Sequence, residues 1–478
     1  MPQQETAIQF VKGDKVGDET DYRDALPVNM YVVPKPIFEE KGYMIQNYGL
    51  TLHGDGVYPC RGGFYNDRQG KQFRVQGNTV VDVAENGDVT FLGSVTGYDA
   101  LTNQIPPVSM DYSFNTQAIL ADGRFFLYDP INLFRQYPDV DVGSPIDFIW
   151  IDGYYFFTDG INLYHTLASD EEQIDPLDFG VNQFMPDKPK ALGKTQDDKV
   201  IVWGRYSTEY FENDATPDFA FRRIQSRAVK VGVVATHLKA ELSSTWYFVG
   251  GGRNESIGVH VLGVGATQKI STREIEKILD EYSEPDLVNA HMESYTNEDI
   301  SFIKIHLPNH TLLFNQNAAS AFGTLAAWTI LKSDVKGDTP DRSSYPVFDT
   351  RIGDWVVGDL YNGNIGIMDK LVGTQYGEIV EWLLFSPFIY AEDDSIDELE
   401  LQSIPGYTAT NDANVFLSIT YEGVFYGKEF LVDYGMINEY GKRFIARRLG
   451  YVRDYFSIKL RGASKSRMAF SRGKLTHG

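Results

Sequence analysis

A short apolar run, a tight turn and a second apolar run recur along most of the chain. Two examples are QAILADGRFFLYD at 117–129 and SFIKIHLPNHTLLFN at 301–315. Alternating apolar runs of this length indicate β-strands, and Asp-Gly, Asn-Gly or Pro-Asn turns let the backbone reverse between them. The pattern predicts an all-β chain built mainly from hairpins.

The hairpins follow one another at a nearly regular interval. Their turn centres lie 37 to 56 residues apart, a range typical of the blades of a β-propeller. The centres are Gly77, Gly123, Gly160, Arg205, Arg253, Asn309 and Gly363. This loose period predicts a propeller of six or seven blades. The alternative is a sandwich or a set of small barrels, because no Trp-Asp or Asp-box signature accompanies the period.

Changes in composition divide the chain into three parts. Residues 1–70 are rich in Pro, Gly and polar groups and predict an extended arm with little regular structure, followed by the first strands. Residues 71–372 form the propeller-like body, with one helical insertion near 271–292, where Ser271-Thr-Arg-Glu274 has the spacing of a capping box. Residues 373–478 predict a strand-rich, sandwich-like module with a basic end. Arms of this kind often reach onto neighbouring copies, so deletion of residues 1–45 is expected to leave a folded chain that docks poorly.

Charge is distributed unevenly along the chain. The whole chain carries −23, which argues against nucleic-acid binding as a default mode, because phosphates require cations. From Lys442 to the end, however, 11 Lys and Arg residues accompany a single acid, Asp454, whereas residues 392–400 (EDDSIDELE) are strongly acidic. The basic stretch is either a strand pair with solvated charges or a docking surface for an acidic partner or a neighbouring copy. The candidate assembly residues are Arg443, Arg447, Arg448 and Arg453.

Metal-binding patterns in the sequence are incomplete. His306 and His310 have H-x3-H spacing, but a Pro-Asn turn separates them and no third ligand stands nearby in the sequence. An acidic stretch around Gly143 loosely resembles a calcium loop, yet Trp150 occupies the position of the closing Glu. The acids of this stretch are Asp139, Asp141 and Asp147. We expect neither a metal site nor another cofactor from these patterns.

Catalytic motifs are absent from the sequence. No G-x-S-x-G elbow occurs, and the single cysteine, Cys60, has no obvious His partner. The glycines at 250–252 lack the G-K-[ST] ending of a phosphate loop and are expected to form a hairpin turn. Nothing marks a glycosidase carboxylate pair among the 66 acids. The expected protein is therefore not an enzyme.

Secretory and membrane-spanning signals are also missing. The start of the chain has no apolar h-region, and the apolar stretch 318–331 is too short to span a bilayer. A single cysteine is compatible with assembly in a reducing cytoplasm. We expect no membrane insertion.

Several longer segments match a known family in order along the chain. The most specific are IEKILDEYSEPDLVNAHMES at 275–294 and IHLPNHTLLFN at 305–315. Shorter ones are LPVNM at 26–30, STEYFE at 207–212, QYGEIVEWLLFSPF at 375–388 and KRFIARRLGYVR at 442–453. Together they resemble the packaged-DNA stabilisation, or tail hub, proteins of short-tailed phages that infect Salmonella and Shigella. The hairpins between these segments and the tail after Ala463 are less similar.

The resemblance implies a structural protein of the virion tail with a β-propeller body and no cofactor. Family members form a six-copy hub that docks below the portal-adaptor ring, continues the DNA channel and helps to retain the packaged genome. The hub also connects to the tail needle and the tailspikes, and duplex DNA passes through it without sequence-specific binding. The alternative is a receptor-binding or carbohydrate-active phage tail propeller.

Overall fold

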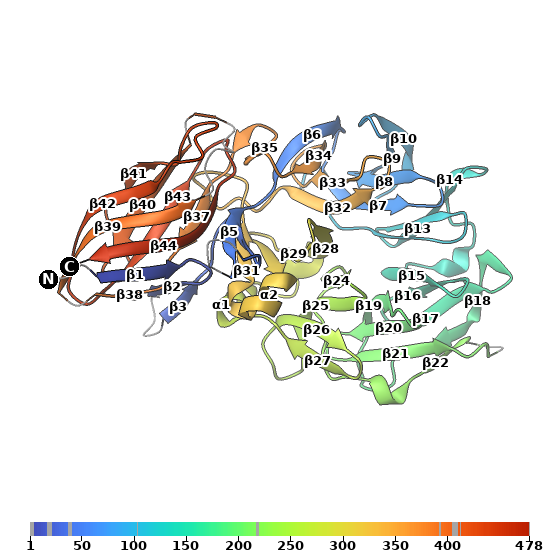
Figure 1. Cartoon of the computed structure of the whole chain (residues 1–478). Coiled ribbons are helices and arrows are strands. Elements are labelled where there is room, and N and C mark those ends of the chain that lie inside the picture. Colours follow the sequence, from blue (N-terminus) through green and yellow to red (C-terminus); the bar gives the residue numbers. More distant parts are fainter. Residues whose placement is uncertain are drawn as a thin grey trace.

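The computed structural model describes residues 4–16, 22–36, 41–102, 104–216, 219–391, 393–403, 410–411 and 413–477. Strands dominate this part of the chain, and they form a β-propeller with a β-sandwich beside it (Figure 1). The predicted all-β architecture of propeller body and C-terminal sandwich is confirmed. The described propeller has seven sheets, within the expected range of six or seven blades.

Six of the blades are antiparallel meanders in sequence order. The first blade consists of β7 (Cys60–Asn66), β8 (Lys71–Gln76), β9 (Thr79–Val83) and β10 (Val89–Ser94). The second consists of β11 (Ser109–Tyr112), β12 (Gln117–Ala121), β13 (Arg124–Asp129) and β14 (Leu133–Gln136). The third consists of β15 (Asp147–Ile151), β16 (Tyr154–Thr158), β17 (Leu163–Leu167) and β18 (Asp170–Gly180). The fourth blade consists of β19 (Pro189–Lys194), β20 (Lys199–Gly204), β21 (Thr208–Asn213) and β22 (Phe221–Arg223). The fifth consists of β23 (Gly232–Val233), β24 (Lys239–Leu242), β25 (Thr245–Gly251), β26 (Gly258–Gly263) and β27 (Ala266–Lys269). The sixth consists of β28 (His291–Asn297), β29 (Ile300–His306), β30 (Thr311–Asn315) and β31 (Trp328–Leu331).

The seventh blade closes the ring with a strand from the other end of the propeller. Its strands are β32 (Ser343–Asp349), β33 (Asp354–Asp359), β34 (Asn364–Asp369), β6 (Gly49–Asp55), β35 (Thr374–Gln375) and β36 (Glu378–Ile379). Strand β6 precedes the first blade in sequence, yet it pairs antiparallel with β34, so that Gly49 stands opposite Asp369. The propeller therefore begins before residue 71 and extends past residue 372.

Many blade turns are held by an aspartate that caps its own loop. Asp129, Asp159 and Asp359 each accept hydrogen bonds from the backbone N–H groups two and three residues further on. An Asp side chain can satisfy these N–H groups while the chain reverses, which is the mechanism of an Asx turn. The repeated D-x-x-N pattern is thus a local cause of the hairpins.

Aromatic side chains fill the space between blades. Phe125 packs edge-to-face against Phe148, Tyr155 and Phe157, with ring centroids 4.8 to 5.3 Å apart. Such pairs contribute about 0.5–1.5 kcal/mol each beyond the area they bury. The high aromatic content of the sequence serves the contacts between neighbouring sheets.

The sandwich draws its strands from both ends of the chain (Figure 1, left). One sheet contains β4 (Met30–Val33), β5 (Tyr43–Gln46), β44 (Ala469–His477), β39 (Asp394–Ser403) and β42 (Phe444–Val452), with β1 (Gln4–Gln9) paired to β44. The other contains β37 (Trp382–Phe385), β43 (Tyr455–Gly462), β40 (Asn414–Thr420) and β41 (Phe430–Asp433), with β38 (Ile389–Tyr390) paired to β43. Leu399, Phe470, Leu417 and Leu460 are fully buried in the core that the two sheets share.

The N-terminal segment carries more regular structure than the sequence predicted. Strand β1 runs antiparallel to β44, and Ile8 and Phe10 are each 1% exposed. Strands β2 (Gly13–Val16) and β3 (Tyr22–Ala25) pair with each other. The segment is extended, as expected, but its described strands pair within its own chain because the C-terminal sheet offers β44 as an edge.

Residues 27–29 join the two parts of the molecule. Val28 exchanges backbone hydrogen bonds of 3.0 Å with Leu383 of the sandwich, while Pro27 and Asn29 bond to Ile330 of the sixth blade. The Asn29 side chain is buried and donates to the carbonyl oxygens of Lys332 and Glu381 at 2.8 and 2.7 Å. The LPVNM segment is therefore the joint between propeller and sandwich.

Helices are few among the described residues. The predicted insertion contains α1 (Arg273–Asp280) and the 3-10 turn η3 (Asp286–Asn289). The N-cap is Thr272, whose hydroxyl accepts from the N–H of Ile275. The predicted capping box from Ser271 to Glu274 is therefore wrong, because the helix begins one residue later and its third position is Ile275, which has no carboxylate. The others are α2 (Gln316–Phe322), η1 (Val140–Val142), η2 (Gln225–Arg227) and η4 (Thr324–Ala326). None of these helices has the length and apolar character that a bilayer crossing requires.

Candidate functional site

The predicted assembly residues lie on or beside β42, an edge strand of the sandwich. Strand β42 pairs with β39, which carries most of the acidic segment of the sequence. The basic and the acidic stretches, widely separated in sequence, are therefore adjacent strands of one sheet. We expected the C-terminal end to be basic, but this strand pair presents mixed charge, because the arginines face their own chain's carboxylates.

Two of the four arginines form defined ion pairs. Arg443 contacts both carboxylate oxygens of Glu400, with 2.6 Å between Nε and Oε1. Arg447 donates from Nε to Oε2 of Glu398 at 2.7 Å. The hydrogen bond from Arg443 lowers the pKa of Glu400 below its ordinary value. The two arginine side chains are 60% and 67% exposed, so solvent screens both pairs and each adds little to the stability of the fold.

The other two arginines are also exposed, Arg448 in the middle of β42 and Arg453 directly after it. Arg448 has a φ of 57° and lies close to an irregularity in the pairing of β42 with β39. Together with Arg443 and Arg447 it lines a shallow hollow that also contains Glu398 and Glu400. Arg453 follows β42 and is not among the residues that line the hollow. The structure brings three of the predicted residues together and leaves Arg453 at the side.

The histidines of the H-x3-H pattern have different partners. The Nδ1 atom of His310 lies 2.5 Å from the hydroxyl of Tyr282, whereas Nε2 of His306 lies 3.1 Å from Oε1 of Glu293. His291 also lies beside Glu293. Glu293 and His291 face His306 across the pairing of β28 with β29, so spacing between neighbouring positions in the sequence does not indicate them.

These residues belong to a buried polar layer between blades six and seven, here called the polar seam. Its members are His291, Glu293, Lys304 and His306 of blade six and Asp341, Ser343 and Tyr345 of blade seven and the loop before it. Lys304 Nζ lies 2.6 Å from Asp341 and 3.5 Å from Glu293, and the three side chains are at most 7% exposed. The N–H of Tyr345 donates to Oε2 of Glu293 at 2.6 Å.

Burial controls protonation in the polar seam. It lowers the pKa of His291 and of His306 well below the ordinary value, and the nearby Lys304 charge adds to this effect at His306. Burial opposes ionisation of Asp341, but Lys304 overcomes it and lowers the pKa of that carboxyl. The two imidazoles are therefore neutral at pH 7, while Lys304 and Asp341 form a charged pair.

The aspartates of the calcium-like stretch also have different partners. Asp139 accepts from the N–H groups of Asp141 and Ile174 and caps a 3-10 turn. Asp147 points to a different set of groups and forms an ion pair with Lys239. Because each side chain already has its own partners, the stretch does not form a shared set of ligands.

The glycine-rich segment at 250–252 was predicted to be a hairpin turn, but Gly250 and Gly251 are the last residues of β25 and only Gly252 begins the turn to β26. Cys60 is fully buried, and burial raises the pKa of its thiol. A buried thiol with a raised pKa is a poor nucleophile. Neither feature supplies a catalytic group in the described residues.

These observations define the class of the chain. It is a two-part all-β protein, with a seven-bladed propeller closed by an N-terminal strand and a sandwich that uses both chain ends. A family model described as "Bacteriophage P22 Gp10, beta-propeller" matches residues 6–373, and one described as "Bacteriophage P22 Gp10, beta-sandwich" matches residues 381–478. The chain belongs to the P22 Gp10 family and is a component of a phage tail.

A curated relative agrees with the family models over the full length. The chain is 28% identical over 488 aligned positions to the tail hub protein gp10 of Salmonella phage P22, and the match covers 98% of each protein. The resemblance drawn from the sequence segments is thereby confirmed.

Two solved structures are similar to the chain at low identity and low TM-score. Virginiamycin B lyase from Staphylococcus aureus is 12% identical with a TM-score of 0.41, and the match covers 68% of this chain and 98% of the lyase. The Pan2 WD40 domain of Neurospora crassa is 6% identical with a TM-score of 0.40, covering 68% and 96%.

Proposed function

We propose that this chain is a structural tail hub protein that docks below the portal-adaptor ring, continues the DNA channel and helps to retain the packaged genome. In this role it also connects to the tail needle and the tailspikes. The observation that carries the proposal is the match of both family models in order, together with a relative named as a tail hub over the same length. The proposed role is non-enzymatic.

The architecture suits a component that must hold against pressure. Every propeller sheet packs against its neighbours, and the ring is closed by hydrogen bonds between β6 and β34. The joint at Val28 ties the sandwich to this ring. In a ring of six copies, each modest contact is repeated at every interface, so many weak contacts resist displacement together.

The overall charge of the chain supports a role as a channel for packaged DNA. The chain carries −23, so a lumen lined by such copies repels phosphates. Duplex DNA can then slide without sequence-specific contacts. Phosphate repulsion also explains how a channel can stay free of tightly bound DNA during ejection.

The assembly surface that we propose contains Arg443, Arg447 and Arg448, with Arg453 at its side. Exposed arginine pairs of this kind can exchange an intramolecular carboxylate for one on a partner at small cost. Strand β41 lies beside β42 (Figure 1). This strand and the loop after it carry exposed apolar side chains. The apolar side chains are Leu431, Met436, Ile437 and Tyr440. Apolar anchors ringed by polar groups are typical of protein interfaces.

DNA retention tests the proposal directly. Purified chain is added to DNA-filled heads that lack this protein, and released DNA is measured over time. The expected result is retention that rises with added chain and is lost with heat-denatured chain. Continued leakage with folded, head-bound chain would contradict the sealing role. Binding of the chain to host cells without binding to heads would favour the receptor-binding alternative.

A further inference from the structure

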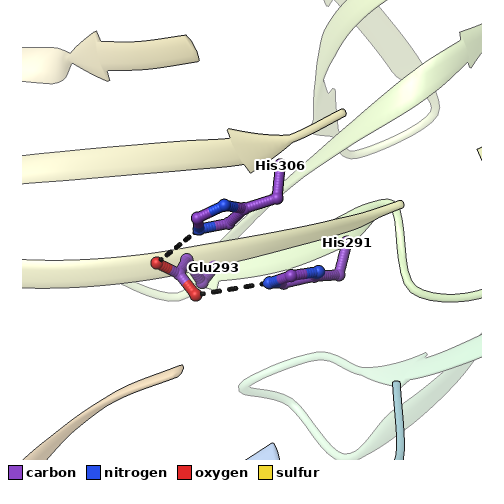
Figure 2. A group of neighbouring side chains, drawn as sticks. All are labelled: His291, Glu293 and His306. Atoms are coloured by element: carbon purple, nitrogen blue, oxygen red, sulfur yellow. Dashed lines mark hydrogen bonds and ion pairs between the residues drawn. The ribbon is translucent and has the colours of Figure 1, made fainter. Parts of the chain in front are cut away.

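Three donor side chains of the polar seam converge on one point (Figure 2). His291 stands directly opposite His306 in the antiparallel pairing of β28 with β29. Glu293 is two residues beyond His291, so both side chains lie on the same face of β28. Residues directly opposite each other on paired strands are the closest cross-strand neighbours, so the His306 side chain lies beside those of His291 and Glu293.

The spacing of the donor atoms matches the coordination sphere of a small transition-metal ion. Oε1 of Glu293 lies 3.1 Å from Nε2 of His306, and Oε2 lies 3.7 Å from Nε2 of His291. Tetrahedral bonds of roughly 2.1 Å place neighbouring ligand atoms about 3.4 Å apart. The two observed distances lie on either side of that value.

A second observation points to a missing ligand. His291 is 95% buried, given its 5% exposure, and its Nε2 atom has no hydrogen-bond partner among the described residues. Figure 2 shows this atom directed toward Glu293. Buried polar atoms nearly always have a hydrogen-bond partner, but Oε2 of Glu293 lies 3.7 Å from this nitrogen, too far for a hydrogen bond. A metal ion between the ring nitrogen and the carboxylate would satisfy both.

We propose that His291, Glu293 and His306 form a binding site for a divalent transition-metal ion of the zinc type. Two neutral imidazoles and a carboxylate suit Zn²⁺ or Co²⁺ and do not suit Mg²⁺ or Ca²⁺, which take oxygen ligands. The bound ion ties β28 to β29 next to blade seven. Its role is structural, because the three donors lie inside the protein rather than in a cleft.

The surroundings can adapt to the ion. The two rings are now stacked, with centroids 4.4 Å apart and planes at 16°, so each ring rotates to direct Nε2 at the metal. Lys304 lies 3.5 Å from Glu293 and keeps Asp341, 2.6 Å away, as its counter-ion when the metal takes the carboxylate. Because the donors are closed off from solvent, the ion enters during folding.

The test is refolding of the full chain with Co²⁺, followed by removal of unbound metal. Wild type is expected to retain about one ion per chain and to show the visible ligand-field bands of a tetrahedral site, which Zn²⁺ then abolishes. His291→Gln and His306→Gln should lose the ion. His310→Ala is the matched control, because His310 belongs to the same hairpin but bonds to Tyr282.

Folded wild type that retains no Co²⁺ would overturn the proposal, as would full retention by folded His291→Gln. If the glutamine variants do not fold, the melting temperature of the wild-type chain tests whether the site binds metal. Refolding with Zn²⁺ should raise it by several degrees relative to refolding with Mg²⁺. Equal melting temperatures would also overturn the site.

Discussion

Arg447 and Glu398 stand directly opposite each other on β42 and β39, with 2.7 Å between Nε and Oε2. The acidic and basic stretches of the sequence thus neutralise each other across one strand pair. Because the arginine is 67% exposed, the contact orients the guanidinium without locking it. The pair leaves Arg447 available to a partner that offers a better placed carboxylate.

Replacing Arg443, Arg447 and Arg448 together with Ala should weaken assembly with little effect on folding. Exposed ion pairs contribute about 0.2–1 kcal/mol each, so the melting temperature should change by a few degrees at most. Association between copies or with the adaptor ring should weaken about tenfold, as measured by sedimentation. Arg222→Ala is the control, since Arg222 is 64% exposed and pairs with Glu212 on the propeller. Unchanged assembly of the triple variant at physiological salt would remove these residues from the interface.

Removing residues 1–45 should prevent stable folding of the sandwich. The sequence suggested a dispensable arm, but the deletion takes away β1 and β4 and nearly all of β5, and with them the buried Ile8 and Phe10. The single change Ile8→Ala should destabilise the sandwich by about 2–5 kcal/mol in chemical denaturation. Ala7→Ser, at an exposed position of the same strand, should have little effect. A folded truncated chain with a native melting temperature would restore the arm interpretation.

Asn29→Ala should loosen the joint between propeller and sandwich. The side chain makes three buried hydrogen bonds, two to carbonyl oxygens and one from the N–H of Lys332. Leaving such groups unpaired should cost about 2–4 kcal/mol, and limited proteolysis should cut between the two parts. Asn438→Ala controls for backbone strain, because Asn438 is exposed and has a φ of 65° against 51° at Asn29. Equal effects of the two changes would mean that the hydrogen bonds do not matter.

Acidification should destabilise the propeller before its carboxylates titrate. Burial lowers the pKa of His237 to about 4, and the pKa values of His291 and His306 shift in the same direction. The unfolded chain takes up protons near pH 6.5 while the folded chain does not, so stability falls as the pH drops from 6.5 toward 4. At pH 5.5, His237 alone should account for about 1.4 kcal/mol of lost stability. His237→Gln should flatten the pH dependence of the denaturation midpoint. An unchanged pH dependence in this variant would contradict the prediction.

The hairpins could be predicted because their causes are local. Alternating apolar residues and capping aspartates such as Asp129 act within a few positions of the turn they stabilise. The partners of Arg443 and Arg447 could not be assigned, because strand order in a sheet depends on the whole chain. His291 and Glu293 were missed for the same reason, since only the register of β28 against β29 brings them to His306. The acidic run at 392–400 is evident in the sequence, but its position beside the basic strand could not be predicted from it.

The closure of the ring by β6 also determines which contact of the propeller forms last during synthesis. Strand β6 is synthesised before any complete blade, while its partner β34 emerges only after most of the propeller. Such a distant contact forms late, because the intervening chain must be ordered first. A chain that stops short of Asp369 has an open ring and cannot present a finished propeller. Truncated translation products therefore lack the hydrogen bonds that close the ring.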